Sequence, residues 1–345
     1  MARDCRVLLI GFGNVGRRWC ELLTEELPSH PQLKRLRIVC VGIFTANHGS
    51  CVDTDGIDLA RVLRLYRLHS HLPLDSRGAR EMSVAEAVDK LDYDVLIELT
   101  TLSIERRGEP AVGFVKRALR RGLHVVTANK GPAAFALPEL RELAHRGACR
   151  FLFESTVLDG FPVFNLQRHC LSAARIMRLE GILNCTSNFV LASALEQGDL
   201  AGAVAEAQRQ GFAEADPRLD LLGWDAAAKI TILANSFLQS NLTPLEVPRD
   251  EVTSGLIEEL AKRRRPGDCW RLVAQARGQG ADVEARVELM NVAPEHPFRT
   301  LGPSSGGLLI ESDLTGRLFF AQRDPDLTDT AYGVIQDLWE LRDSI

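Results

Sequence analysis

A short segment, residues 211–229, gathers four carboxylates and one lysine around a turn and a helix start. The acidic residues are Glu214, Asp216, Asp220 and Asp225, and the basic residue is Lys229. Asp216 precedes a proline, and Gly223 closes the turn before residues 224–239, which have the pattern of a helix. Such a cluster has the chemistry to bind an ammonium group and to donate a proton.

Asp225 and Lys229 lie four residues apart, so on a helix both side chains share one face, with the acid N-terminal to the base. The same spacing is common in exposed ion pairs, which contribute only about 0.3–0.5 kcal/mol. The three carboxylates upstream favour a functional site, because an exposed helix needs no such cluster.

Composition sets the class of protein. A chain of 345 residues with 46% hydrophobic and 25% charged residues is expected to form two globular domains. A net charge of −5 argues against nucleic acid as a partner. No apolar run approaches the length of a membrane span, and the eight cysteines lack CxxC spacing. We therefore expect a cytoplasmic protein with reduced thiols that binds neither nucleic acid nor membrane.

The N-terminus has the order of a dinucleotide site. Residues 6–10 are apolar and predict a strand, and the stretch after residue 16 predicts an amphipathic helix. Between them lies a GxGxxG motif made of Gly11, Phe12, Gly13, Asn14, Val15 and Gly16. The first glycine permits the turn, the second lets the backbone approach a pyrophosphate, and the third lets helix pack on strand. The phosphates would meet the helix N-terminus.

Further apolar runs alternate with helical patterns over the first part of the chain. Expected strands are 36–44, 95–99, 124–127 and 150–153, and expected helices are 110–121 and 138–145. This alternation predicts an α/β fold with a Rossmann-type, doubly wound parallel sheet.

Polar residues follow two of these strands. Thr100 and Thr101 come after strand 95–99, and Asn129 and Lys130 follow the strand that begins at residue 124. Sheets of this kind bind ligands at their carboxyl edge, so we expect these side chains near a cofactor. Lys130 could meet a cofactor phosphate or a substrate carboxylate; the alternative is an ordinary surface residue.

The end of the second strand bears on the choice of cofactor. Residues 43–48, which include Thr45, contain no acid to accept the ribose hydroxyls of NAD. This favours NADP, but an arginine that would clamp its 2′-phosphate is also missing there, so NAD stays open.

The pattern changes beyond about residue 155 and predicts a second, α+β domain. Its expected helices are 191–209 and 224–239, and its expected strands are 174–182, 282–289 and 307–312. We place the domain boundaries at 1–154 and 155–316. The last segment, 317–345, has helical periodicity over 329–341 and should return to the first domain.

Several motifs in this order resemble homoserine dehydrogenases, and the resemblance covers nearly the whole chain. They are GFGNVG at 11–16, VVTANKGP at 125–132, ESTVLDGFPVF at 154–164, GILNCTSNF at 181–189 and the segment 211–229. The resemblance implies NAD(P)-dependent interconversion of L-homoserine and L-aspartate 4-semialdehyde, in threonine and methionine biosynthesis. It also implies a homodimer built through the second domain, and a short form without a C-terminal regulatory domain.

The resemblance assigns roles to single residues. Lys229 would donate a proton to the aldehyde oxygen, with Asp225 orienting it and Lys130 as a second cation. This agrees with the chemistry, since an ammonium stabilises the charge that hydride addition leaves on a carbonyl oxygen. Residues expected at the substrate are Glu214, Asp220, Thr186, Cys185 and Phe212. Residues expected at the cofactor are Gly11, Phe12, Gly13, Asn14, Val15, Gly16, Thr45, Thr100, Thr101, Asn129, Lys130 and Gly333.

Residues 154–161 are similar to the family's loop for a monovalent cation such as sodium. Main-chain oxygens of Glu154, Val157, Asp159 and Phe161 would hold the ion, and such oxygens suit a hard cation. The alternative is an ordinary hinge turn.

Four departures from the family pattern keep other functions open. Leu158 and Asp159 stand in a region usually filled by glycine, Cys185 replaces a glycine, and Phe212 replaces a tyrosine. Residues 322–326, QRDPD, occupy a loop that is normally rich in glycine. The alternatives are a related dehydrogenase for another small amino or hydroxy acid, or a catalytically silent NADP-binding sensor.

Overall fold

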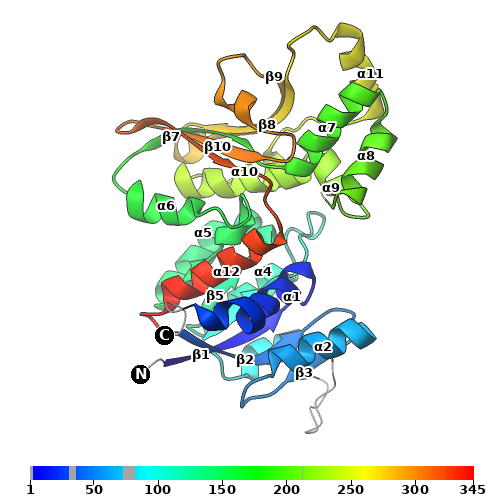
Figure 1. Ribbon diagram of the computed structural model, residues 1–345. Coiled ribbons are helices and arrows are strands. Elements are labelled where there is room, and N and C mark those ends of the chain that lie inside the picture. Colours follow the sequence, from blue (N-terminus) through cyan, green and yellow to red (C-terminus); the bar gives the residue numbers. More distant parts are fainter. Residues whose placement is uncertain (1–2, 31–35, 73–81, 212) are drawn as a thin grey trace. The chain divides into compact units, whose positions relative to one another are not determined.

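The computed structural model describes residues 3–30, 36–72, 82–211 and 213–345, and the chain forms two compact units (Figure 1). Unit 1 comprises Met1–Phe164 and Asp326–Ile345, and unit 2 comprises Asn165–Pro325. The expected boundaries lie at 154/155 and 316/317. In the structure the second boundary lies after residue 325 and not after residue 316, because the strand that ends at Gln322 pairs within the sheet of unit 2.

Unit 1 is built on a six-stranded sheet with the order β3-β2-β1-β4-β5-β6. Its strands are β1 (Arg3–Ile10), β2 (Leu36–Phe44), β3 (Ser50–Val52), β4 (Val95–Glu98), β5 (His124–Thr127) and β6 (Phe151–Leu152). All neighbours pair in parallel except β2 and β3. The order reverses between β1 and β4, the place where doubly wound sheets bind ligands. The predicted Rossmann-type sheet is confirmed.

Helices cover both faces of this sheet. They are α1 (Asn14–Glu21), α2 (Leu59–His69), α3 (Val84–Lys90), α4 (Ala111–Arg120), α5 (Lys130–Arg146) and α12 (Leu327–Leu341). Val7 and Leu9 share one core with Trp19 of α1 and Leu338 of α12, so the C-terminal helix packs on this sheet (Figure 1). Leu8, between them, is also fully buried. Helix α4 contacts β4, β5 and α5.

Helix α5 is longer than predicted. The expected segment, 138–145, omits its first two turns because Pro138 is a usual helix breaker. The chain accommodates this proline through a kink at Ala136, whose backbone leaves helical geometry (φ −142°). Lys130 therefore occupies the first helical position rather than a loop.

Unit 2 contains a five-stranded antiparallel sheet with the order β11-β10-β7-β8-β9. Its strands are β7 (Ile176–Ile182), β8 (Trp270–Arg277), β9 (Glu284–Asn291), β10 (Gly306–Ser312) and β11 (Gly316–Gln322). The helices are α7 (Cys185–Gln197), α8 (Leu200–Arg209), α9 (Arg218–Leu221), α10 (Trp224–Phe237) and α11 (Ser254–Arg263), after α6 (Val163–Cys170). Helix α10 contacts β7, β8 and β9. The predicted α+β character is confirmed.

One helix prediction is wrong. The expected helix 191–209 is two helices, α7 and α8, which lie side by side (Figure 1). Gly198 takes the left-handed conformation (φ 73°) that ends α7, and Asp199 caps α8 by accepting hydrogen bonds from Ala201 N and Gly202 N. A glycine followed by an aspartate stops one helix and starts the next, a signal that periodicity alone obscures.

Some features are lacking among the described residues. No helix of this part of the chain is both long and apolar enough to cross a membrane. Within the same residues the cysteines form no disulfide, and no three His, Cys, Asp or Glu side chains gather as a metal site.

Candidate active site

The glycine loop of unit 1 has the geometry of a dinucleotide cradle. Gly11 takes φ +98°, and a Cβ there would lie 2.5 Å from the Leu99 oxygen. A Cβ on Gly16 would lie 2.5 Å from the Gly11 oxygen, whereas one on Gly13 would meet nothing within 4 Å. The first and third glycines thus permit close packing, and the second leaves open space. The N-terminus of α1 begins at this loop and suits a pyrophosphate.

The remaining loop residues differ in where their side chains lie. Phe12 is buried and meets Tyr66 of α2 edge-on at 5.2 Å, so its side chain belongs to the core. Asn14 is exposed and accepts a hydrogen bond from Arg17 at 2.7 Å, and Val15 is half-buried. Phe12 can therefore contact a ligand at this loop only through its backbone.

The end of β2 is bordered by an aromatic and cationic cluster. Thr45 Oγ1 donates to Gly49 O and accepts from His48 N, both at 2.8 Å. His48 and Arg17 both contact the ring of Tyr66, with separations of 5.6 Å between ring centroids and 5.2 Å from the guanidinium carbon to the centroid. Helix α1 thus contributes an arginine, Arg17, to this cluster. Its position directly after Gly16 was the signal in the sequence.

A polar network joins the carboxyl ends of β4 and β5. Asn129 Nδ2 donates to Thr100 Oγ1 at 3.1 Å, and Asn129 Oδ1 caps α5 by accepting from Gly131 N at 2.8 Å. Lys130 follows directly and is half-buried, whereas Thr101 is exposed. The network also contains Glu98, a fully buried acid that sequence analysis missed although it ends an apolar strand.

In unit 2, Lys229 and Asp225 form a buried pair. Lys229 Nζ lies 2.9 Å from Asp225 Oδ2 and donates to the main-chain oxygen of Leu183 at 2.7 Å. The two side chains are only 11% and 12% exposed. The alternative of an exposed ion pair on a helix surface therefore does not apply. Gly223, with φ 73°, starts α10 and brings both residues to this point.

Asn184 organises the acids of the cluster. Its Nδ2 group donates to Asp220 Oδ1 at 2.6 Å and to Asp225 Oδ2 at 2.7 Å. Its Oδ1 caps α7 by accepting from Ser187 N at 2.7 Å. One buried amide thus holds two carboxylates and a helix start together. Sequence analysis did not single out Asn184, although an asparagine before an expected helix is a capping signal.

The structure does not bring all four predicted carboxylates together. Glu214 is exposed. Asp216 pairs with exposed Arg218, whose hydrogen bonds hold the pKa of that carboxyl at about 2. Only Asp220 and Asp225 meet at Asn184.

The other predicted substrate residues lie at the start of α7 or outside the described residues. Cys185 and Thr186 are the first residues of α7 after its cap, Asn184, and both are half-buried. A helical position accepts a cysteine in place of glycine without backbone strain. Phe212 lies outside the described residues.

The predicted cation loop is a tight turn within unit 1. Leu158 and Asp159 take φ of 53° and 52°, the left-handed region in which glycine is usual. Glu154 is fully buried: its carboxylate accepts from Phe164 N at 2.6 Å, and its own N–H donates to buried Asp337 at 2.9 Å.

Gly333 lies in α12 against this turn. A Cβ there would come within 2.4 Å of Ser155 Oγ and 3.3 Å of Gly160 Cα. The structure thus explains the glycine by close packing of α12 on the loop. Its predicted contact with a cofactor stays a prediction.

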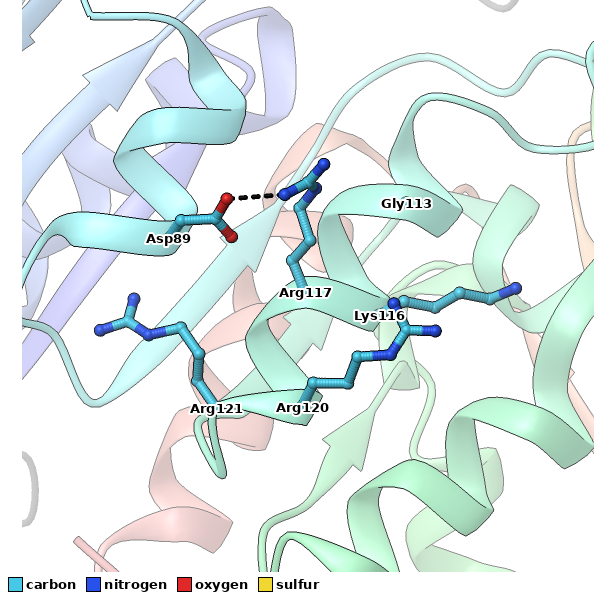
Figure 2. Close-up of a pocket in the computed structure, with 6 residues that line it drawn as sticks. All are labelled: Asp89, Gly113, Lys116, Arg117, Arg120 and Arg121. Atoms are coloured by element: carbon cyan, nitrogen blue, oxygen red, sulfur yellow. Dashed lines mark hydrogen bonds and ion pairs between the residues drawn. The ribbon is translucent and has the colours of Figure 1, made fainter.

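A cavity of about 450 Å³ lies away from all of these residues, beside α4 (Figure 2). It is lined by Asp89, Gly113, Lys116, Arg117, Arg120 and Arg121. Arg117 meets Asp89 at 2.6 Å, whereas the side chains of Lys116 and Arg120 point away from that pair (Figure 2). The cations do not converge on one point, and no predicted site residue lines the cavity.

Fold and site together define a class. A Rossmann-type unit with a glycine cradle, joined in one chain to an α+β unit with a buried lysine–carboxylate cluster, is typical of NAD(P)-dependent oxidoreductases. The model of the homoserine dehydrogenase NAD-binding domain matches residues 11–154, and the homoserine dehydrogenase model matches residues 162–339. The chain belongs to the homoserine dehydrogenase family, whose members are NAD(P)-dependent oxidoreductases acting on a CH–OH group.

Relatives and solved structures agree with this assignment. The chain is 33% identical to the NAD(+)-dependent homoserine dehydrogenase of Pseudomonas canavaninivorans, covering 99% of this chain and 97% of the relative. It is 30% identical to the homoserine dehydrogenase of Methanocaldococcus jannaschii over 98% of each chain. In fold it is similar to the Thermoplasma acidophilum homoserine dehydrogenase, with a TM-score of 0.84, 23% identity and coverage of 99% and 100%. A hyperthermophilic archaeal homoserine dehydrogenase in complex with NADPH has a TM-score of 0.82 at 24% identity, with 99% of each chain covered.

Proposed function

We propose that Lys229 is the proton donor when L-aspartate 4-semialdehyde is reduced to L-homoserine, and the proton acceptor in reverse. The observation that carries this is the buried ammonium, held between Asp225 Oδ2 and the Leu183 oxygen. A nicotinamide cofactor would supply the hydride that adds to the carbonyl carbon, and the C=O electron pair would move to the oxygen. Lys229 stabilises that charge and delivers one proton to it.

The other members of the cluster have positioning or binding roles in this proposal. Asp225 orients Lys229, and Asn184 fixes the carboxylates of Asp225 and Asp220. Asp220, with Glu214 at the exposed end, binds the amino group of the substrate. Thr186 and Cys185 contact the substrate from the first turn of α7, and Lys130 contributes the second cation.

The test follows reduction of NADP and NAD by absorbance, with L-homoserine as substrate. Lys229→Met keeps most of the length of the side chain and removes the ammonium, so we expect turnover to fall about 10²–10⁴-fold. Lys90→Ala, an exposed lysine on α3, is the matched control. A Lys229→Met enzyme with the wild-type rate would reject the assignment.

The same assay separates the alternatives. If the wild type ignores homoserine but reduces cofactor with another small amino or hydroxy acid, the substrate differs. If it binds NADPH and turns over none of them, it is a silent sensor.

We propose that the chain prefers NADP to NAD. The second strand ends without an acid, and Arg17 and His48 bracket Tyr66 beside Thr45. A guanidinium and an imidazole at this position suit the 2′-phosphate that distinguishes NADP. Related proteins differ: the Pseudomonas protein is named NAD(+)-dependent, and an archaeal structure contains NADPH.

We propose a homodimer formed through the sheet of unit 2, in the cytoplasm. The sheet carries an apolar cluster that includes Ile182, Val273 and Phe298, with half-buried Leu309 and Phe319 beside it. The first three are buried within the unit, whereas the partly exposed surface of Leu309 and Phe319 suits contact with a second copy. Eight cysteines without a disulfide among the described residues fit a reducing compartment.

We also propose that the turn at 154–161 binds sodium through the main-chain oxygens of Glu154, Val157, Asp159 and Phe161. Left-handed Leu158 and Asp159 turn successive carbonyls, and the buried carboxylates of Glu154 and Asp337 supply balancing charge. The Phe161 oxygen already accepts from Val163 N at 2.7 Å, and its second lone pair suits a cation.

A further inference from the structure

Glu98 is a buried acid for which the mechanism above has no use. It ends β4 and its exposure is 0%. Its carboxyl group contacts neutral partners, Asn129 among them: Oε1 accepts from Thr100 N at 2.8 Å and from Thr100 Oγ1 at 2.5 Å, and Oε2 lies 2.9 Å from Thr127 Oγ1. Among the described residues no cation pairs with it. A buried carboxyl is costly, so its presence needs a reason.

The partners of Glu98 come from two neighbouring strands. Thr100 follows β4, and Thr127 ends β5. Asn129 joins both, because its Nδ2 donates to Thr100 Oγ1 at 3.1 Å and its N–H donates to Thr127 Oγ1 at 3.0 Å. One carboxyl group thus ties together the two loops at the carboxyl edge of the sheet.

These loops border the proposed cofactor site. The Leu99 oxygen, next to Glu98, lies 2.5 Å from where a Cβ on Gly11 would be, so the segment 98–100 packs against the glycine cradle. Asn129 caps α5, whose first residue is Lys130. A shift of the Glu98 carboxyl would move Thr100, Asn129 and the start of α5 together.

We propose that Glu98 is a positioning residue for the cofactor: through Thr100 and Thr127 it holds the ends of β4 and β5 in the arrangement that binds the dinucleotide. This inference rests on the proposed function of unit 1 as the cofactor domain. It does not depend on the roles assigned to unit 2.

The hydrogen bonds are those of a neutral acid. Thr127 Oγ1 lies 2.8 Å from the main-chain oxygen of Glu98 and 2.9 Å from Oε2, but the hydroxyl has only one proton. If Oε2 carries a proton, it donates to Thr127 Oγ1, which then donates to the main-chain oxygen, and every short contact contains a hydrogen. Burial raises the pKa of Glu98, against the hydrogen bonds from Thr100, Thr127 and Asn129. Glutamine has the shape of this neutral form and a donor in the place of the Oε2 proton.

The experiment measures the Kd for NADPH by titrating its fluorescence, with the melting temperature of each variant alongside. We expect Glu98→Ala to raise the Kd about tenfold or more, and Glu98→Gln to stay within about threefold of the wild type. The matched control is Tyr93→Phe, which removes a buried hydrogen bond to Val88 O in the same unit and should leave the Kd unchanged.

Several results would overturn the proposal. Wild-type affinity in a folded Glu98→Ala protein of lowered melting temperature would make Glu98 structural only. An equally weak Glu98→Gln protein would reject the neutral acid. If Glu98→Ala does not fold, Thr127→Val severs the same link, and unchanged NADPH affinity there would reject positioning.

The proposed function and this inference can fail separately. Titration with NADPH needs no turnover, so a protein inactive on homoserine still tests Glu98. If the wild type does not bind NADPH or NADH, both proposals fail. If it binds and Glu98→Ala binds equally well, only the inference fails.

Discussion

Lys229 and Asp225 show how burial changes the contribution of a common ion pair to stability. The same i, i+4 spacing on an exposed helix contributes about 0.3–0.5 kcal/mol. Here both side chains are nearly buried, and Asn184 and the Leu183 oxygen complete their hydrogen bonds. Removal of one charge from a buried pair costs more, about 3–5 kcal/mol, because its partner is left uncompensated. We therefore expect activity and stability both to depend on this pair.

Arg17 provides the residue-scale test of cofactor preference. Arg17→Ala should lower kcat/KM for NADP about tenfold and leave kcat/KM for NAD within about twofold. The substitution removes a charged hydrogen bond that only the 2′-phosphate of NADP can accept. The measurement is the ratio of kcat/KM for the two cofactors. Arg37→Ala, an exposed arginine that pairs with Asp4, is the control. Equal losses for both cofactors would show that Arg17 does not distinguish them.

At the scale of elements, the turn between β6 and α6 tests the cation proposal. An ion that binds only the folded protein raises the free energy of unfolding with the logarithm of its concentration above the Kd, by about 2.7 kcal/mol when that concentration is 100 times the Kd. We expect the melting temperature to rise by a few degrees with the logarithm of the NaCl concentration, but not with choline chloride at the same ionic strength. Superimposable curves in the two salts would identify an ordinary hinge turn.

The elements also show which local signals predict structure. β2 and β5 have the predicted bounds, because apolar runs between helical segments leave little choice. β8 and β11 were not predicted. Their sequences mix apolar and charged residues, and they form strands because neighbouring elements cover one face of each. Gly198 and Asp199 ended a helix that periodicity continued.

At the scale of the whole molecule, the proposed dimer predicts a particle of twice the 38.1 kDa of one chain. Sedimentation equilibrium at assay concentrations measures this mass. Phe319→Asp places a charge beside the apolar cluster of the unit 2 sheet and should shift the protein toward monomer. Leu68→Asp, on an exposed face of α2, is the control. A wild-type monomer would contradict the dimer.

The sequence alone determined the Rossmann-type unit, the second α+β unit and the family, because glycine spacing and apolar runs are local properties of a chain. It also indicated Lys229 and Asp225 by their helical spacing. Only the tertiary structure decided which acids meet. Asp220 joins Asp225 through Asn184, which lies 36 and 41 residues away from them in the sequence, so this contact forms only when the elements pack. Asp216 instead pairs locally with Arg218, two residues away.

Tertiary structure likewise placed Arg17 beside Tyr66 and buried Glu98 between two strands. The sequence shows that Arg17 follows the glycine motif and that Glu98 ends an apolar strand, but it does not show the partners of either residue. Burial and partners over long sequence separations arise only when elements pack, and they determine protonation, charge and hydrogen bonding at the site.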